Sequence, residues 1–370
     1  MVQLEKAFAE TSSRLLSMIE TTQDLQNHLT ASKENEAQPV CAIDTEADSL
    51  HRYSESLCLI QFADRKQNVL IDPLAIDDLS SLGEYLSVAT VWMHGADYDM
   101  TMFKRQFGSL PAVVYDTQIG ARLLGVRRFG LGDLVSFYFG IDLTKSSQKA
   151  DWGKRPLSEK MVEYALNDVA YLLEMSDIIV SQLHEKDRYG WFQESCQAAR
   201  QRVLDRDDSK LECWRIQGSG RLEARGLAFL KALWTWRDGE AKSWDRPSFM
   251  VAPNRQLLEW STALAEKKTI DLPTHYRPDR LKRLKGLIDE VESLPPSEWP
   301  PRPLSNRRKR DKDFEKKVDD LIRKREVAAA ELDIEGCLIA PRATLEALAG
   351  GDLEAPETLL QWQRQCLGFD

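Results

Sequence analysis

The sequence has no long apolar run and no cluster of paired cysteines or histidines. No stretch of its 370 residues approaches the roughly eighteen apolar residues that a membrane-spanning helix needs, so we expect no membrane association. The N-terminus, MVQLEKAFAETSSRLLSMIE, lacks the basic-then-apolar order of a secretory signal. We therefore expect a cytoplasmic protein.

The scarcity of soft metal ligands narrows the kind of metal site that the chain can build. Its five histidines are scattered, and no two have metal-ligand spacing. Its six cysteines lie far apart without a C-x-x-C motif, so we expect reduced and mostly buried thiols. These cysteines are Cys41, Cys58, Cys196, Cys213, Cys337 and Cys366. Any metal would therefore be held by oxygen, which favours magnesium or manganese.

The net charge of −9 conceals an uneven distribution along the chain. Residues 1–200 hold 19 Lys and Arg against 29 Asp and Glu, whereas residues 201–330 hold 29 against 22. Residues 331–370 hold 2 against 8. A basic middle beside an acidic N-terminal half indicates that one part binds polyanions and another binds cations.

The length and the hydrophobic periodicity predict an α/β domain followed by helical domains. A helical extension is expected over residues 1–37. Four strands are expected at 39–47, 57–64, 68–72 and 90–96, because these runs are rich in β-branched and aliphatic residues. Helices are expected to dominate from there to residue 200, with Ser158 as the N-cap of one of them.

The remaining sequence divides at a proline- and arginine-rich stretch. Helical periodicity covers residues 209–294, and a second helical segment covers 314–370. Between them, residues 295–313 read PPSEWPPRPLSNRRKRDKD, and proline blocks helix continuation there. We interpret this stretch as a linker. The α/β domain itself is expected to span residues 38–200.

Two carboxylates end the first expected strand, in CAIDTEADSL. Side chains at positions i and i+2 of a strand share a face, so Asp44 and Glu46 would project together. A solvated strand end or an N-cap would explain the same residues, and D-x-E is common in an acidic chain.

Two further stretches carry acids at the ends or faces of helices. In HGADYDMTMFKRQFG, Asp97 and Asp99 both fall in the first turn of an expected helix, where the helix dipole favours acids in any case. In YALNDVAYL, Tyr164 and Asp168 are four residues apart and therefore lie on one helix face. Each motif alone is compatible with an ordinary surface.

The order of the three motifs resembles the tyrosine-bearing branch of the DEDD superfamily of 3′–5′ exonucleases. The stretch LTKSSQKADWGKRPLSEKMVEYALNDVAYLLEM is similar to the corresponding part of the ribonuclease D family, and YDTQIGARLLG resembles the family's D-T-x-x-A-x-x-L helix. The resemblance covers about residues 38–190. It implies a ribonuclease H-like exonuclease fold, with a mixed sheet flanked by helices.

The resemblance also implies the roles of particular residues. The implied metal-binding and catalytic acids are Asp44, Glu46, Asp99 and Asp168, with Tyr164 as the catalytic tyrosine. Asp99 is preferred to Asp97 because it follows Tyr98. Asp116 is acidic as well, but it lies outside the implied quartet and is interpreted as structural.

Two divalent cations, Mg²⁺ or Mn²⁺, are the implied cofactors, because four gathered carboxylates repel one another unless cations are bound. Tyr164, with a reference pKa of about 10, is a poor base at neutral pH. It is expected to orient the attacking water.

The helical half resembles the helicase-and-ribonuclease-D C-terminal (HRDC) domain. Residues 209–294 carry the family's W-R start, a helix ending in WRD and the DRPSFMVAPNRQLLE turn. Residues 314–370 are similar to a second such module, with packing as an alternative role because this segment is acidic. The first module holds five tryptophans, which we expect to be mostly core: Trp214, Trp234, Trp236, Trp244 and Trp260.

Two basic clusters are candidate nucleic-acid contacts, although a solvated charged surface is an equal alternative. One is the linker run Arg307, Arg308, Lys309, Arg310 and Lys312, and the other is Lys282, Arg283 and Lys285.

The resemblance implies a 3′–5′ exoribonuclease that releases nucleoside 5′-monophosphates. Its partner would be RNA with a free 3′ end, with tRNA precursors and tRNA 3′-end maturation as the expected task; nothing indicates an obligate protein partner. A DNA 3′–5′ exonuclease would use the same chemistry, and a non-catalytic RNA-binding scaffold would keep the same fold. The 2′-hydroxyl contacts that distinguish RNA from DNA are not evident from sequence.

Overall fold

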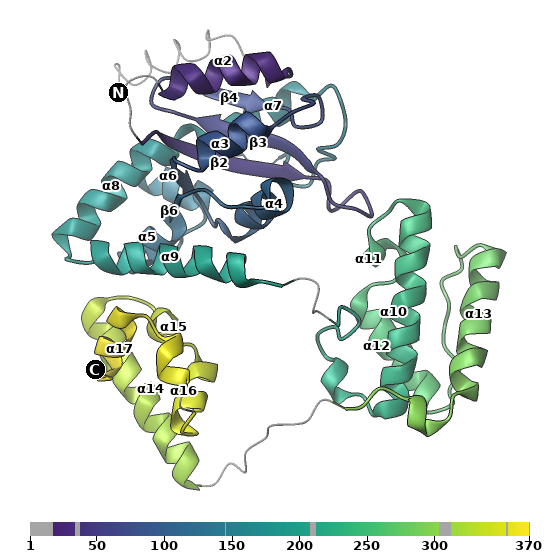
Figure 1. Ribbon diagram of the computed structural model, residues 1–370. Helices are drawn as coiled ribbons and strands as arrows, with labels where there is room; N and C mark the ends of the chain where they lie inside the picture. Colours follow the sequence, from purple (N-terminus) through teal and green to yellow (C-terminus); the bar gives the residue numbers. More distant parts are fainter. Residues whose placement is uncertain are drawn as a thin grey trace. The chain divides into compact units, whose positions relative to one another are not determined.

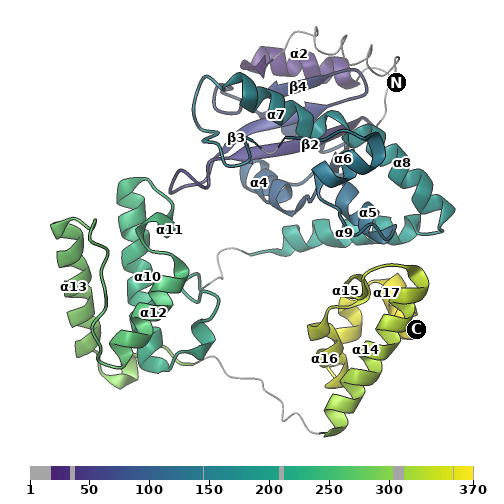
Figure 2. The same cartoon turned by 180° about the vertical axis from the view of Figure 1, so that it is seen from behind.

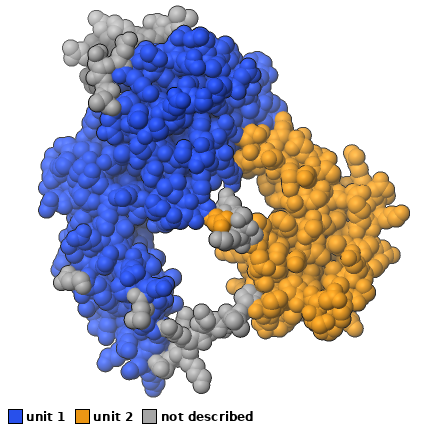
Figure 3. Space-filling view, in the orientation of Figure 1, with its two compact units in different colours: residues 1–47, 57–206, 308–370 blue, residues 48–56, 207–307 orange. Residues whose placement is uncertain are grey.

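The computed structural model describes residues 18–33, 38–144, 146–207, 212–302, 312–352 and 354–369. The chain divides into two compact units, which Figure 3 shows in different colours. Unit 1 comprises residues 1–47, 57–206 and 308–370, and unit 2 comprises residues 48–56 and 207–307.

A six-stranded mixed sheet forms the centre of unit 1 within the described residues (Figure 1). Its strands are β1 (Met18–Ile19), β2 (Val40–Ala47), β3 (Leu57–Ala63), β4 (Asn68–Ile71), β5 (Thr90–Met93) and β6 (Val113–Asp116). The spatial order is β1-β4-β3-β2-β5-β6. Strand β3 runs antiparallel to both β2 and β4, and the other pairings are parallel.

All four predicted strands are present, and two short strands were not predicted. Strand β1 has only two residues. Strand β6 has four, as β4 and β5 do, but it runs directly into a helix, Thr117–Leu123, within a stretch expected to be helical. Both lie at the edges of the sheet, where β1 pairs with β4 and β6 pairs with β5. They pair through main-chain contacts between segments distant in sequence, which local propensity does not report.

Helices cover both faces of the sheet and make a three-layer architecture (Figures 1 and 2). Helices α2, α3 and α4 pack with Ile43, Ile60 and Phe62 in one apolar cluster. Helices α5, α6 and α8 pack against the other face, and α7 contacts β2, β3 and β4. The bounds are α2 (Thr22–Lys33), α3 (Ser80–Leu86), α4 (Asp97–Phe107), α5 (Thr117–Leu123), α6 (Leu131–Phe139), α7 (Glu159–Ala170), α8 (Leu172–Glu185) and α9 (Tyr189–Asp205).

The C-terminal helices belong to unit 1 rather than to the helical unit 2. They are α14 (Lys312–Leu332), α15 (Gly336–Ile339), α16 (Arg342–Ala349), the 3-10 turn η4 (Ala355–Thr358) and α17 (Gln361–Leu367). The indole of Trp362 on α17 stacks on Trp191 of α9 with ring centroids 5.0 Å apart. Arg122 of α5 pairs with Glu335 at 2.9 Å. These helices therefore complete the core on one side of the sheet domain.

Unit 2 is built from helices around a tryptophan-rich core. Its elements are η2 (Ser219–Arg221), α10 (Ala224–Trp244), α11 (Ser248–Val251), α12 (Asn254–Ala265), α13 (Pro278–Ser293) and η3 (Pro296–Glu298). The core prediction holds for three of the five tryptophans, because Trp214, Trp236 and Trp260 are buried. Trp234 is half-buried, whereas Trp244 is 48% exposed at the end of α10.

The segment that follows β2 is part of unit 2, which the sequence did not indicate. The Tyr53 hydroxyl donates to Asp238 Oδ2 at 2.9 Å, and Arg246 Nη1 donates to the His51 carbonyl oxygen at 2.8 Å. Both partners lie on or just after α10. Segment 48–56 is therefore fixed by polar contacts to this unit.

Two expectations from composition can be compared with the structure. All six cysteines are free, but only Cys41, Cys58 and Cys196 are buried, so the expected burial holds for half of them. Within the described ranges, no helix combines the length and the hydrophobicity needed to cross a bilayer.

Candidate active site

Strand β2 presents two acids on one face at its C-terminal end. Asp44 lies directly opposite Gln61 of β3, and Glu46 lies opposite Leu59. The pairing shifts between Glu46 and Ala47, and such an irregularity bends a strand and redirects its side chains. The sequence prediction that both acids share a strand face agrees with this geometry.

Helix α4 supplies a third acid from its first turn. Asp99 is only 5% exposed, and the Thr45 hydroxyl donates to its Oδ1 at 2.5 Å. Asp97, the alternative left open by the sequence, is exposed and pairs with Arg206 at 2.9 Å. The structure therefore places Asp99, and not Asp97, beside the acids of β2.

Helix α7 supplies the fourth acid and the tyrosine. The side chain of Ser158 accepts a hydrogen bond from the Met161 amide, which confirms the predicted N-cap. The helix lies against β2, β3 and β4, and its Tyr164 and Asp168 are one turn apart and hydrogen-bonded to each other.

Three of the four acids come together closely enough to share a cation. Carboxylate oxygens of Asp44, Glu46 and Asp168 lie within 4.8 Å of one another. Asp99 is outside this closest group but near enough to repel Asp44. In the described part of the chain, no lysine or arginine forms an ion pair with any of the four.

Burial raises the pKa of every acid in the group, and repulsion within the group adds to it at Asp44, Glu46 and Asp168. Burial is the main cause at Glu46, where with the Asp168 and Asp99 charges it raises the pKa to about 9. Burial likewise raises the pKa of Asp168 to about 7, against a lowering by the Tyr164 hydrogen bond. The pKa of Asp44 lies well above its usual range, because the group is buried and faces the other three.

Asp99 is affected less, because its hydrogen bonds favour the ionised form. Burial raises its pKa to about 6, while the hydroxyl of Thr45 opposes that increase. The ionised form of these four carboxyl groups is disfavoured because no positive charge lies beside them. Hard divalent cations prefer carboxylate oxygen and would supply that charge. The arrangement indicates a divalent-cation site.

Tyr164 keeps its phenolic proton in this environment. Burial, followed by repulsion from Asp168, Glu46 and Asp44, holds the pKa of the hydroxyl far above its usual range. The ring packs near Trp152, with centroids 6.1 Å apart. Tyr164 can therefore act as a hydrogen-bonding group but not as a free phenolate at neutral pH.

The loop before α7 is held by an arginine inside the RPL stretch. The Arg155 guanidinium donates to Asp72 Oδ1 at 2.7 Å and to the carbonyl oxygens of Cys58 and Trp152, each at 2.7 Å. This ties the loop to β3 and to the end of β4, and fixes the buried Trp152 beside Tyr164. Arg155 thus supports the position of the tyrosine indirectly.

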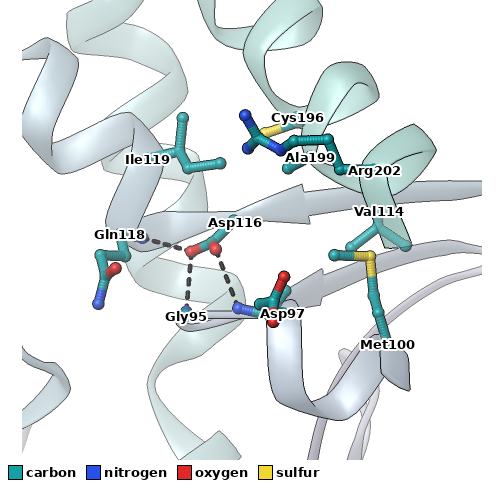
Figure 4. A pocket seen from close by; sticks show the side chains of 11 residues that line it. Gly95, Asp97, Met100, Val114, Asp116, Gln118, Ile119, Cys196, Ala199 and Arg202 are labelled. Atoms are coloured by element: carbon teal, nitrogen blue, oxygen red, sulfur yellow. Dashed lines mark hydrogen bonds between the residues drawn. The ribbon is translucent and has the colours of Figure 1, made fainter. Parts of the chain in front are cut away.

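Asp116 has a structural position, as interpreted from the sequence. Its carboxylate accepts from the amides of Gly95, Ala96 and Gln118 at 2.9, 3.0 and 2.8 Å, and it caps α5 (Figure 4). It therefore fixes the turn that leads from β5 into α4 and so places Asp99.

A pocket of about 180 Å³ lies beside this turn, lined by residues that include Gly95, Asp97, Asp116 and Arg202 (Figure 4). None of the four converging acids lines it. The candidate chemistry is therefore not in this pocket but at the carboxylate group.

One contributor escaped the sequence reasoning. Thr45 is the middle residue of D-T-E, and alternation along a strand puts its side chain on the face opposite Asp44 and Glu46. Its hydroxyl nevertheless binds Asp99. The only sequence signal for it is that a hydroxyl stands between the two acids.

The basic candidates are resolved only in part. Arg307, Arg308, Lys309 and Arg310 lie outside the described residues. Lys282, Arg283 and Lys285 are exposed on α13, but Arg283 pairs with the buried Glu240 of α10, with its Nη2 2.9 Å from Oε2. That pairing gives Arg283 a structural role, whereas Lys282 and Lys285 stay candidates for phosphate contact.

Comparison with known proteins agrees with this geometry. A family model described as "3'-5' exonuclease" matches residues 16–184. Ribonuclease D of Pseudomonas paraeruginosa is 30% identical over 357 residues, covering 91% of this chain and 92% of that protein. Ribonuclease D of Escherichia coli is 33% identical over 286 residues, covering 73% and 74%.

A solved structure supports the same assignment. The crystal structure of Escherichia coli RNase D, described as an exoribonuclease involved in structured RNA processing, matches with a TM-score of 0.73 and 26% identity. The match covers 95% of this chain and 98% of that one. Together with the motif order and the convergent acids, these similarities show that the chain belongs to the ribonuclease D family of 3′–5′ exoribonucleases.

Proposed function

We propose that Asp44, Glu46, Asp99 and Asp168 hold two divalent cations, Mg²⁺ or Mn²⁺, and that the site hydrolyses the last phosphodiester at the 3′ end of RNA. Water attacks phosphorus, the bond to the 3′ oxygen of the penultimate nucleotide breaks, and a nucleoside 5′-monophosphate leaves. The observation that carries the proposal is the convergence of unpaired acids with raised pKa values.

The cations, when bound, would supply positive charge for the phosphoryl group and activate water. The chain's own residues supply the rest. The four carboxylates orient the charge, the Thr45 hydroxyl fixes the Asp99 carboxylate, and the protonated Tyr164 offers a hydrogen bond on the side of Asp168. A phenol with a reference pKa of about 10 keeps its proton at neutral pH, so Tyr164 positions water and does not take a proton from it.

The proposed substrate is the 3′ end of structured RNA, with tRNA precursors as the specific case. The Escherichia coli relative is described as acting in structured RNA processing. In this chain, exposed Lys282 and Lys285 lie in the basic segment 201–330. Such side chains can bind the phosphates of a folded RNA.

The test of the site compares acids inside and outside the convergent group. Asp44→Asn and Asp168→Asn each remove one charge and are expected to lower nucleotide release in Mg²⁺ by more than about a hundredfold, since each loses a metal ligand. Asp97→Asn is the matched control, because Asp97 lies on the same helix as Asp99 but is exposed and paired with Arg206.

The assay uses 5′-labelled and 3′-labelled RNA of the same sequence, with a matched DNA strand. Stepwise shortening of the 5′-labelled strand and immediate release of labelled mononucleotide from the other would give direction and product together. Full activity in Asp44→Asn would contradict the proposed site. Faster digestion of the DNA strand than of the RNA strand would favour the DNA exonuclease instead.

A further inference from the structure

A buried glutamine next to Asp44 has no hydrogen-bond partner. Gln61 of β3 is 0% exposed, and neither its amide nitrogen Nε2 nor its amide oxygen Oε1 makes a hydrogen bond among the described residues. Leaving such a group buried and unpaired destabilises the folded state, because its hydrogen bonds to water are lost and not replaced. An apolar side chain would be more stable at this position, so the presence of an amide indicates a functional role.

The sheet register places Asp44 beside this amide, and the other neighbours of the amide on this face are apolar. Gln61 pairs with Asp44 across β2 and with Leu70 across β4. Directly opposed residues in an antiparallel pair share a face, with Cβ atoms about 4.5–5.5 Å apart. On its own strand, the same-face neighbours at positions 59 and 63 are Leu59 and Ala63. Among these neighbours, only Asp44 offers a polar side chain.

The helix above this face adds apolar cover. Leu59, Leu70 and Ala165 of α7 form one buried cluster with Trp152. The amide therefore lies between apolar side chains and the carboxylate group. On the β2 side, the residue directly opposite this N–H donor carries a carboxylate, that of Asp44.

We propose that Gln61 is a positioning residue, whose side-chain N–H donates to the Asp44 carboxylate when that carboxylate holds a cation. The inference rests on the proposed function of the four acids. Carboxylates that bind a metal use one oxygen for it, and the other is ordinarily fixed by a hydrogen bond from a neighbouring group. Hydrogen bonds to an ionised oxygen are stronger than those between neutral groups. Gln61 would thus gain its partner in the loaded state.

The test replaces the amide by an apolar side chain of similar length, Gln61→Met. Without divalent ions, this variant is expected to melt at the same temperature as the parent or higher, because an unpaired polar group is gone. Its affinity for Mn²⁺, measured by calorimetry without RNA, is expected to fall about tenfold or more. The rise in melting temperature on adding Mn²⁺ should shrink accordingly, and kcat should fall while the KM for RNA stays constant.

The matched control is Ser81→Ala on α3, which also removes a buried hydroxyl without a partner. It should leave Mn²⁺ affinity unchanged.

Parent-like Mn²⁺ affinity in Gln61→Met would overturn the inference. A lower melting temperature without cations, or a failure to fold, would also overturn it, because either result would mean that the amide stabilises the fold. Asp44→Asn separates the two hypotheses. If it binds Mn²⁺ normally, the proposed site itself is wrong; if it loses Mn²⁺ and Gln61→Met does not, only the role of Gln61 fails.

Discussion

Four carboxyl groups face one another near β2, and the ionised form of each is less stable there than it would be in water. The unfolded chain ionises such groups at about pH 4, whereas in the fold the pKa is about 7 at Asp168 and about 9 at Glu46. Between these values the folded protein binds more protons than the unfolded one. Its free energy of unfolding therefore falls as pH rises from about 4 to about 9.

We accordingly expect the melting temperature of the cation-free protein to decrease between pH 6 and pH 9. Glu46→Gln removes the group whose pKa is raised to about 9 and should flatten this decrease above pH 7. The measurement is a thermal melt in chelator at several pH values. A parent melting temperature that is constant or rises over this range, with no difference from Glu46→Gln, would show that these acids do not titrate as described.

Substitution of Tyr164 should affect catalysis without affecting cation binding. Tyr164→Phe removes the hydroxyl and leaves the ring beside Trp152. We expect kcat to fall by about a hundredfold, because the attacking water loses the hydrogen bond that orients it. Mn²⁺ affinity should change little, because no ligand is lost. A variant that loses Mn²⁺ binding in proportion to kcat would assign the hydroxyl to the metal site instead.

At the scale of elements, strands and helices with strong periodicity were predictable, and pairings were not. The runs that became β2, β3, β4 and β5 are each rich in β-branched and aliphatic residues, and Ser158 marks the start of α7. Asp99 was separable from Asp97 only through the family resemblance. The contact of Thr45 with Asp99 and the register of Gln61 against Asp44 depend on long-range packing, which no local pattern encodes.

The packing of α17 on α9 gives a prediction about stability. Trp362 is 3% exposed and stacks on Trp191, and its indole N–H donates to Ser195 Oγ at 3.3 Å. Trp362→Ala should lower the free energy of unfolding of unit 1 by about 3–5 kcal/mol. Trp244→Ala is the control, since that tryptophan belongs to unit 2 and its loss should leave the unfolding of unit 1 unchanged.

Urea denaturation followed by circular dichroism, with activity measured in parallel, would compare the two variants. Equal midpoints would mean that the C-terminal helices do not stabilise the sheet domain. Cutting the chain at residue 209 would remove α17 together with unit 2, so a truncation there would confuse the two effects.

At the scale of the whole molecule, an internal replacement keeps unit 1 complete. Exchanging residues 209–307 for a flexible linker retains the sheet domain and the helices from α14 onward. We expect short single-stranded oligonucleotides to be digested at nearly the parent rate, because the acids and Tyr164 all belong to unit 1. Digestion of folded RNA should slow, because the exposed cations Lys282 and Lys285 are removed with unit 2.

The salt dependence distinguishes electrostatic binding from other causes. For each phosphate that the protein no longer neutralises, the slope of log affinity against log salt should decrease by about 0.7 on single strands. Lys282→Ala combined with Lys285→Ala in the full chain should reproduce part of that change. An unchanged slope in both variants would mean that α13 does not bind RNA.

The hydrogen bond from Thr45 to Asp99 has a consequence for how much the chain can vary at this strand. The pattern D-x-E leaves the middle position open to any residue. In this molecule all three consecutive side chains are engaged, two of them on one face of the sheet and one through a hydroxyl to α4. In a saturation library at residues 44–46, we therefore expect substitutions at all three positions to abolish nuclease activity. The single exception is serine in place of Thr45, because it keeps the hydroxyl.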